Sequence, residues 1–166
     1  RLTPIAFGAW AIGGWMWGGN DDKDAIAAIH ACLDHGITSI DTAPVYGYGD
    51  SEKLVALALE GVRRDQVQIL TKFGLRWDTD QGILHFSSTF PDGSVSHIHK
   101  YGGKDGIIKE IEDCLARLST DYIDLFQIHW ADETTPIDET MEALSRLIDQ
   151  GKIKAAGVSN YNEEQM

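Results

Sequence analysis

Asp41, Lys72 and His129 each lie at or just beyond the end of a short apolar run that is rich in β-branched residues, and Tyr46 follows shortly after Asp41. A carboxylate, an ammonium, an imidazole and a phenol that meet at one place can transfer protons and stabilise developing charge. The simpler interpretation is that Asp41 and Lys72 form a structural ion pair and that His129 is a hydrogen-bonded core residue. The choice depends on whether the fold brings the four side chains together.

The apolar runs have the length and composition of buried β-strands, and stretches of helical period separate them. The predicted strands are residues 5–10, 37–40, 67–70, 122–128 and 153–158. Strands that alternate with helices form a parallel sheet, whose strands all end at the same edge. Because side chains alternate along a strand, the parity of Asp41, Lys72 and His129 allows them to converge on one face at that edge.

Two of the helices are predicted from apolar residues that recur at steps of three and four. The buried face of the first is expected to contain Ile107, Ile111, Cys114 and Leu118, and that of the second Ile137, Met141, Leu144 and Ile148. Each of these faces needs a sheet to cover it.

The spacing of the strand ends gives the chain its expected organisation. Asp41 to Lys72, and His129 to Ser159, are each separated by about 30 positions, the length of one βα unit, whereas Lys72 to His129 is nearly twice as long. The surplus corresponds to the polar stretch 77–101, which we interpret as an insertion after the third strand and a flap over a pocket.

The fold is therefore expected to be α/β, either an open doubly wound sheet or a closed (β/α)8 TIM barrel. No predicted strand is followed by a G-x-G-x-x-G turn, and the nearest glycine pairs are interrupted by Trp15 and Trp17. We favour the barrel, with residues 1–166 as a single domain that holds only about its first five βα units. The remaining units are expected from a longer chain.

Composition excludes several classes of partner. The formal net charge is −12, with 26 acidic and 14 basic residues, which would repel nucleic acid and anionic lipid. No apolar run is long enough for a membrane span, so we expect a cytoplasmic protein. Cys32 and Cys114 lie in helical patterns and are expected to be buried thiols, although a disulfide stays open.

Five segments, in order along nearly the whole chain, resemble the landmarks of the aldo-keto reductase family. They are IDTAPVYG at residues 40–47, TKFG at 71–74, DYIDL at 121–125, QIHW at 127–130 and GVSN at 157–160. The resemblance implies reduction of an aldehyde or ketone to an alcohol, with hydride from NADPH and a small-molecule carbonyl compound as substrate.

The same resemblance assigns roles to the catalytic residues. Tyr46 is expected to donate the proton as general acid, and the ammonium of Lys72 to lower the pKa of that phenol. Asp41 is expected to hold Lys72 charged and in place. His129 is expected to donate a hydrogen bond to the substrate oxygen.

The cofactor contacts implied by the resemblance are at the strand ends. Ser159 and Asn160 are expected to bind the nicotinamide carboxamide, Ala9 and Trp10 to approach the cofactor or substrate, and Asp41 to lie beside it. An aromatic wall is expected from Trp15, Trp17, Trp77 and Trp130, although packing under loops is an equally good interpretation for Trp15 and Trp17.

Other functions stay open at this stage. Lys72 could form a Schiff base in an aldolase-like barrel, or the protein could be an NADPH-binding regulatory subunit of the same fold. His97 and His99 form an H-x-H, but no spaced partner completes a metal site, so no metal is expected. The carbonyl substrate and the choice between NADPH and NADH are not readable from the sequence.

Overall fold

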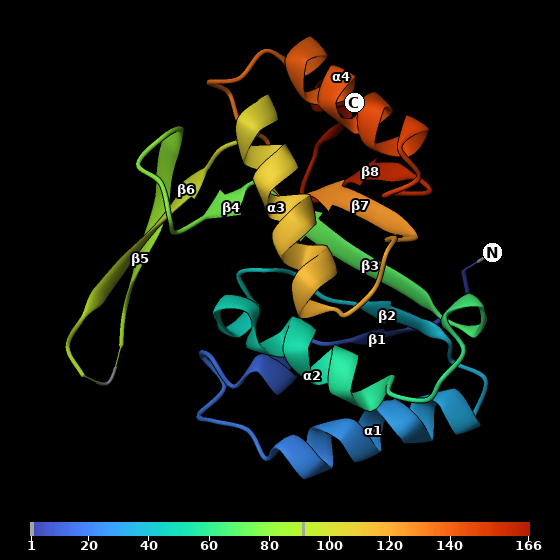
Figure 1. Cartoon of the computed structure of the whole chain (residues 1–166). Coiled ribbons are helices and arrows are strands. Elements are labelled where there is room, and N and C mark those ends of the chain that lie inside the picture. Colours follow the sequence, from blue (N-terminus) through green and yellow to red (C-terminus); the bar gives the residue numbers. More distant parts are fainter. Residues whose placement is uncertain (1, 91) are drawn as a thin grey trace.

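The computed structural model describes residues 2–90 and 92–166 and shows an α/β chain built on two sheets (Figure 1). The larger sheet is parallel, and its strands are β1 (Ala6–Gly8), β2 (Ser39–Asp41), β3 (Gln68–Phe73), β7 (Leu125–Ile128) and β8 (Ala156–Val158). These strands lie side by side in chain order, as successive units of a barrel do. Residues 1 and 91, the second of them inside the predicted insertion 77–101, lie outside the described residues.

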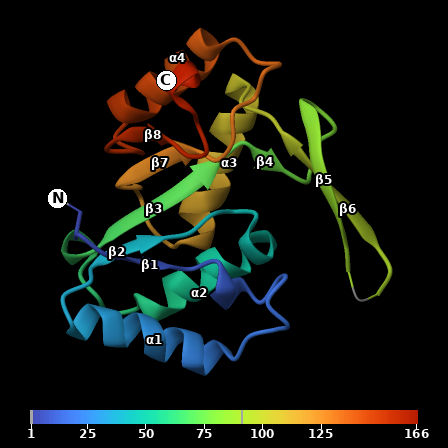
Figure 2. The same ribbon diagram turned by 180° about the vertical axis from the view of Figure 1, so that it is seen from behind.

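Helices cover one face of this sheet and leave the other face open (Figures 1 and 2). They are α1 (Asp22–Asp34), α2 (Asp50–Ala58), α3 (Lys104–Arg117) and α4 (Ile137–Asp149), with short 3-10 turns η1 (Ala11–Gly13), η2 (Tyr46–Gly49), η3 (Arg64–Gln66) and η4 (Glu163–Gln165). Within the described ranges, no helix combines the length and the apolar character that a membrane crossing needs. Both cysteines are free thiols; Cys114 is buried and Cys32 partly so.

The register of the strands explains which side chains face the helices. Ile40, Ile69 and Phe126 are almost completely buried in the core that the sheet forms with the helices. Residues of the other parity point to the open face, where Lys72 lies opposite Gln127 on the neighbouring strand. Asp41 lies opposite Leu70, so it shares that face with Lys72.

The predicted face of α3 is confirmed, but that of α4 is wrong. Ile137, Met141 and Ile148 are 58%, 53% and 43% exposed, and of the predicted set only Leu144 is buried. The buried face instead consists of Thr140, Ala143, Leu144 and Leu147. The contact that accompanies this orientation is tertiary: the Thr140 hydroxyl donates to the Gly102 carbonyl oxygen at 2.8 Å, so the buried hydroxyl on this face of α4 is satisfied.

The second sheet is antiparallel and projects from the body of the chain. It consists of β4 (Leu75–Arg76), β5 (Ile83–Thr89) and β6 (Val95–Lys100), in the order β4-β6-β5. The β5–β6 hairpin extends well away from the parallel sheet in both views (Figures 1 and 2). The stretch 77–101 thus has extended structure of its own in place of the loop that its polar composition suggests.

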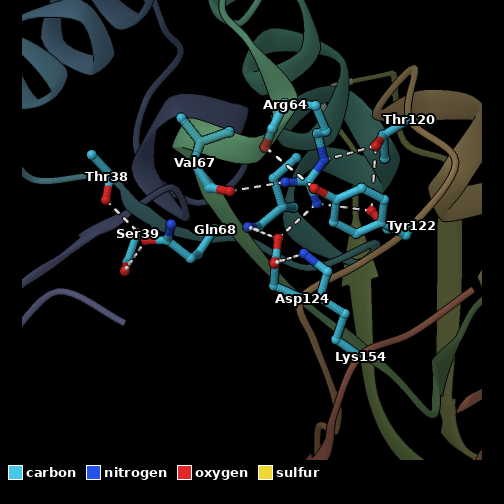
Figure 3. A network of polar contacts seen from close by, with 10 residues as sticks. Thr38, Ser39, Arg64, Val67, Gln68, Thr120, Tyr122, Asp124 and Lys154 are labelled. Carbon is cyan, nitrogen blue, oxygen red and sulfur yellow. Dashed lines mark hydrogen bonds and ion pairs between the residues drawn. The ribbon is translucent and has the colours of Figure 1, made fainter. Parts of the chain in front are cut away.

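A polar network joins the strands at the edge where they begin (Figure 3). Arg64 donates from Nη2 to Asp124 Oδ2 at 2.7 Å, and Asp124 also accepts from the Ile69 amide at 3.0 Å and from Lys154 Nζ at 2.9 Å. The Arg64 guanidinium and the Lys154 ammonium each lie 3.9 Å from the centre of the Tyr122 ring. The segment 121–125 therefore holds the sheet together at the edge opposite to the one where the strands end.

Replacing Asp124 by Ala is expected to destabilise the protein by about 2–3 kcal/mol, because it leaves Arg64 and the Ile69 amide without their acceptor. Burial alone would raise the pKa of Asp124, but the bonds from Ile69, Lys154 and Arg64 hold it below its usual range. The stabilisation is therefore present at neutral pH and is lost as the pH falls below about 4. Urea unfolding of the full-length protein at several pH values measures both effects.

Asp65→Ala is the matched control, since the Arg63–Asp65 pair is solvent-exposed and should contribute less than about 1 kcal/mol. Equal unfolding midpoints for Asp124→Ala and Asp65→Ala would contradict the structural role given to Asp124.

Candidate active site

Asp41 and Lys72 form an ion pair at the edge where the parallel strands end. Lys72 Nζ donates to Asp41 Oδ1 at 2.6 Å and to the carbonyl oxygen of Thr42 at 2.9 Å. The Lys72 side chain is only 7% exposed, and that of Asp41 32%. Two acceptors thus occupy Lys72 Nζ, whereas a Schiff-base lysine needs its nitrogen free to attack a carbonyl carbon.

Tyr46 begins η2 and lies against this pair. Its ring centre is 5.2 Å from Lys72 Nζ and 5.8 Å from the ring centre of Trp10, which stacks on it at 24°. The backbone beside Tyr46 is fixed by a close crossing of η1 and η2: a Cβ on Gly13 would lie 2.9 Å from the Tyr46 carbonyl oxygen, and Gly47 has φ +63°. Only glycine at these two positions allows that crossing without strain.

His129 directly follows β7, and its amide extends the ladder by donating to the Phe73 carbonyl oxygen at 2.8 Å. The residue is 8% exposed, and its ring centre lies 5.6 Å from that of Tyr46 at 82°. Burial, aided by the charges of Lys72 and His85, lowers the pKa of His129 to about 3. The imidazole is therefore neutral near pH 7 and can donate one hydrogen bond.

The expectation that Lys72 lowers the pKa of Tyr46 is wrong. Burial and, secondarily, the charge of Asp41 raise the pKa of Tyr46 to about 12. The main reason is that burial disfavours the charged phenolate, and the nearby Asp41 carboxylate acts in the same direction. The phenol thus keeps its proton throughout the neutral range, and it is still a stronger acid than an aliphatic alcohol.

A pocket of about 400 Å³ lies where Tyr46 and His129 meet. Its walls are Trp10, Trp15, Met16, Val45, Tyr46, Leu75, His85, Phe86, His129, Trp130 and Asn160. Asp41 and Lys72 are not part of this wall. The Lys72 ammonium lies 5.2 Å from the ring centre of Tyr46, which is part of the wall. The pocket wall is mainly aromatic, as is common in sites that bind small organic ligands.

The residues predicted to contact the cofactor differ in their exposure and in their hydrogen bonds. Ala9 is fully buried, whereas Trp10 is 43% exposed. Asn160 has φ +58°, and its Nδ2 donates to the His129 carbonyl oxygen at 2.9 Å and to Ser159 Oγ at 3.1 Å. Ser159 and Asn160 thus form a turn that is tied to the end of β7.

The tryptophans divide between the pocket and its surroundings. Trp15 and Trp130 line the pocket, whereas the rings of Trp17 and Trp77 contact Trp10 and Tyr48, with centres 5.6 Å and 5.2 Å apart. Across residues 2–90 and 92–166, no cluster of three or more His, Cys, Asp or Glu side chains is arranged to hold a metal ion.

Sequence reasoning missed His85 and Phe86, which the β5–β6 hairpin contributes to the pocket wall. A signal was present, since the stretch 83–89 contains apolar and aromatic residues among its polar ones. The sequence pattern predicts a flap here but no site residue.

Comparisons with known proteins agree with this geometry. The sequence profile of the aldo/keto reductase family matches residues 4–166. This chain belongs to the aldo/keto reductase family. An aldo-keto reductase of Bacillus subtilis is 47% identical over 100% of this chain and 46% of its own length. The NADH-specific methylglyoxal reductase of Escherichia coli is 36% identical over 98% of this chain and 50% of its own length.

Solved aldo-keto reductase structures show the same fold. A glycerol dehydrogenase from Gluconobacter oxydans has a TM-score of 0.83 at 45% identity, covering 99% of this chain and 47% of that one. An aldo-keto reductase from Klebsiella pneumoniae in complex with NADPH has a TM-score of 0.74 at 32% identity, covering 99% and 48%. The chain thus spans about half the length of these relatives, and its parallel sheet is part of an aldo-keto reductase TIM barrel.

Proposed function

We propose that the protein reduces an aldehyde or ketone to an alcohol with hydride from a nicotinamide cofactor, and that Tyr46 supplies the proton. The observation that carries this proposal is the meeting of Tyr46, His129 and the Lys72–Asp41 pair beside one aromatic pocket at the carboxyl ends of the strands. In barrels of this kind, that end of the strands is where catalysis occurs.

Each residue has a separate proposed task. The substrate carbonyl oxygen gains negative charge as hydride reaches the carbon, and the neutral imidazole of His129 donates a hydrogen bond to it. Tyr46 transfers its proton to that oxygen. Lys72, held by Asp41, adds positive charge 5.2 Å from the Tyr46 ring and stabilises the phenolate that the transfer leaves.

The cofactor site is proposed from residues that are free to contact a ligand. A bound nicotinamide supplies the hydride. Asn160 uses its side-chain nitrogen within the protein, which leaves its amide oxygen to accept from a carboxamide, beside the Ser159 hydroxyl. Trp10 offers an exposed ring, Asp41 is one-third exposed, and Ala9 contributes only backbone close to the site.

NADPH is the proposed donor, supported by the NADPH complex of the relative from Klebsiella pneumoniae. Because another relative is named NADH-specific, the assay compares both cofactors. On the full-length protein, the absorbance of NADPH and of NADH is followed against a panel of aldehydes, ketones and oxidised sugars. We expect consumption of NADPH that requires the carbonyl compound. Tight NADPH binding without turnover on any member of the panel would favour a regulatory subunit.

A further inference from the structure

Strand β5 contains a β-bulge at His85. The pairing with β6 runs Leu84 to His99 and then Phe86 to Ile98, so His85 has no partner residue across the ladder. Bulges are frequent beside active sites, where they redirect a side chain. In a regular strand His85 and Phe86 would point to opposite faces, but here both are partly buried and both line the pocket of Tyr46 and His129.

The His85 imidazole lies among the aromatic walls of the pocket. Its ring centre is 5.1 Å from that of Trp130 and 5.3 Å from that of Phe86. It lines the same pocket wall as Tyr46 and His129. A ligand whose carbonyl oxygen reaches Tyr46 and His129 therefore brings its neighbouring atoms close to His85.

Within the described part of the chain, no side chain or backbone group forms a hydrogen bond with either ring nitrogen of His85. Partial burial and the charge of Lys100 lower the pKa of His85, and no hydrogen bond contributes to that shift. A neutral imidazole has one donor and one acceptor nitrogen, which together match a hydroxyl group. No lysine or arginine among the described residues lines the pocket wall itself; Lys100, whose charge acts on His85, lines the neighbouring hollow beside Trp130 and Asn160.

We propose that His85 is a specificity-determining residue that hydrogen-bonds a hydroxyl group close to the reacting carbonyl, so that small neutral hydroxy-aldehydes and hydroxy-ketones are the preferred substrate class. This inference rests on the proposed function, because it uses the same pocket and the same carbonyl position. The β-bulge is the structural device that brings the imidazole there, and the aromatic walls hold the carbon chain.

The test compares glyceraldehyde with propanal, which has the same carbon count but no hydroxyl, on the NADPH-loaded full-length protein. His85→Phe keeps an aromatic ring against Trp130 and removes the hydrogen bonds. We expect kcat/KM for glyceraldehyde to fall by about tenfold to a hundredfold, mostly through KM, while that for propanal changes by less than about threefold. His85→Asn restores a donor and an acceptor and should recover most of the lost preference.

His97→Phe is the matched control, because His97 lies on the same hairpin, is exposed, and contacts Ser87 through its Nδ1 at 2.8 Å outside the pocket. It should leave both substrates unaffected. An equal loss for glyceraldehyde and propanal in His85→Phe, or no loss for either, would overturn the role of His85 while carbonyl reduction itself stands. Absence of turnover of both aldehydes by the unmodified protein would instead overturn the proposed function.

Discussion

Tyr46→Phe is expected to lower kcat for carbonyl reduction by roughly a thousandfold and to leave cofactor binding intact. The substitution removes the one hydroxyl that the proposed mechanism uses as general acid, and positioned acids of this kind contribute about a hundredfold to ten-thousandfold. The phenylalanine ring keeps the stacking on Trp10 and the edge contact with His129, so the pocket keeps its shape. Single-turnover oxidation of bound NADPH by an aldehyde measures the effect directly.

Tyr48→Phe provides a matched control two residues further along. The Tyr48 hydroxyl is buried and has no hydrogen-bond partner among the described residues, so its removal breaks no bond. Tyr48 packs against Trp77 and Phe90, outside the pocket wall. We expect full activity from this variant. A Tyr46→Phe protein that reduced aldehydes as fast as the Tyr48→Phe protein would show that the proton comes from elsewhere.

Lys72→Met is the second substitution with a large expected effect. It removes the cation that lies 5.2 Å from the Tyr46 ring and leaves the Asp41 carboxylate to act alone on the phenol. The phenolate formed by proton transfer then lies beside a negative charge, and kcat should fall by about a hundredfold to a thousandfold. Asp41 is one-third exposed, so water can solvate it and the variant should still fold. Steady-state kinetics and circular dichroism report activity and folding separately.

Lys53→Met is the control for loss of a lysine charge. Lys53 pairs with Asp50 on the surface of α2, and both side chains are more than half exposed. This pair is expected to contribute little to stability and nothing to the reaction. If the two lysine variants had the same kcat as the unmodified protein, Lys72 would be a purely structural ion-pair partner.

The parts of this molecule that follow local rules could be predicted from its sequence. The strands were placed within a few residues because apolar runs and helical periods alternate, and side-chain parity correctly put Asp41 and Lys72 on one face. The buried face of α4 could not be predicted from the periodicity of its apolar residues. Two possible faces share Leu144, and the buried one includes Thr140, whose hydroxyl bonds the distant Gly102 carbonyl oxygen, a contact that periodicity does not reveal.

The features that depend on distant contacts were missed for a related reason. The bulge at His85 exists only in the pairing of β5 with β6, so the apolar and aromatic residues of the stretch 83–89 indicate a buried contact but do not identify which side chains reach the pocket. The raised pKa of Tyr46 likewise depends on how deeply the phenol is buried and on the position of Asp41, and both are set by the three-dimensional structure. Sequence spacing predicted that Asp41, Tyr46 and Lys72 lie close together, but it could not predict how burial and charge shift the pKa of Tyr46.

Hydride transfer itself is the most direct measurement of the central claim. The full-length protein is supplied with NADPH that carries deuterium at the transferring position of the nicotinamide, together with an aldehyde, and the alcohol is analysed by mass spectrometry. We predict one deuterium on the former carbonyl carbon in the unmodified protein and its near absence over the same time in Tyr46→Phe. An alcohol without deuterium from the cofactor, or equal labelling by both proteins, would contradict the account.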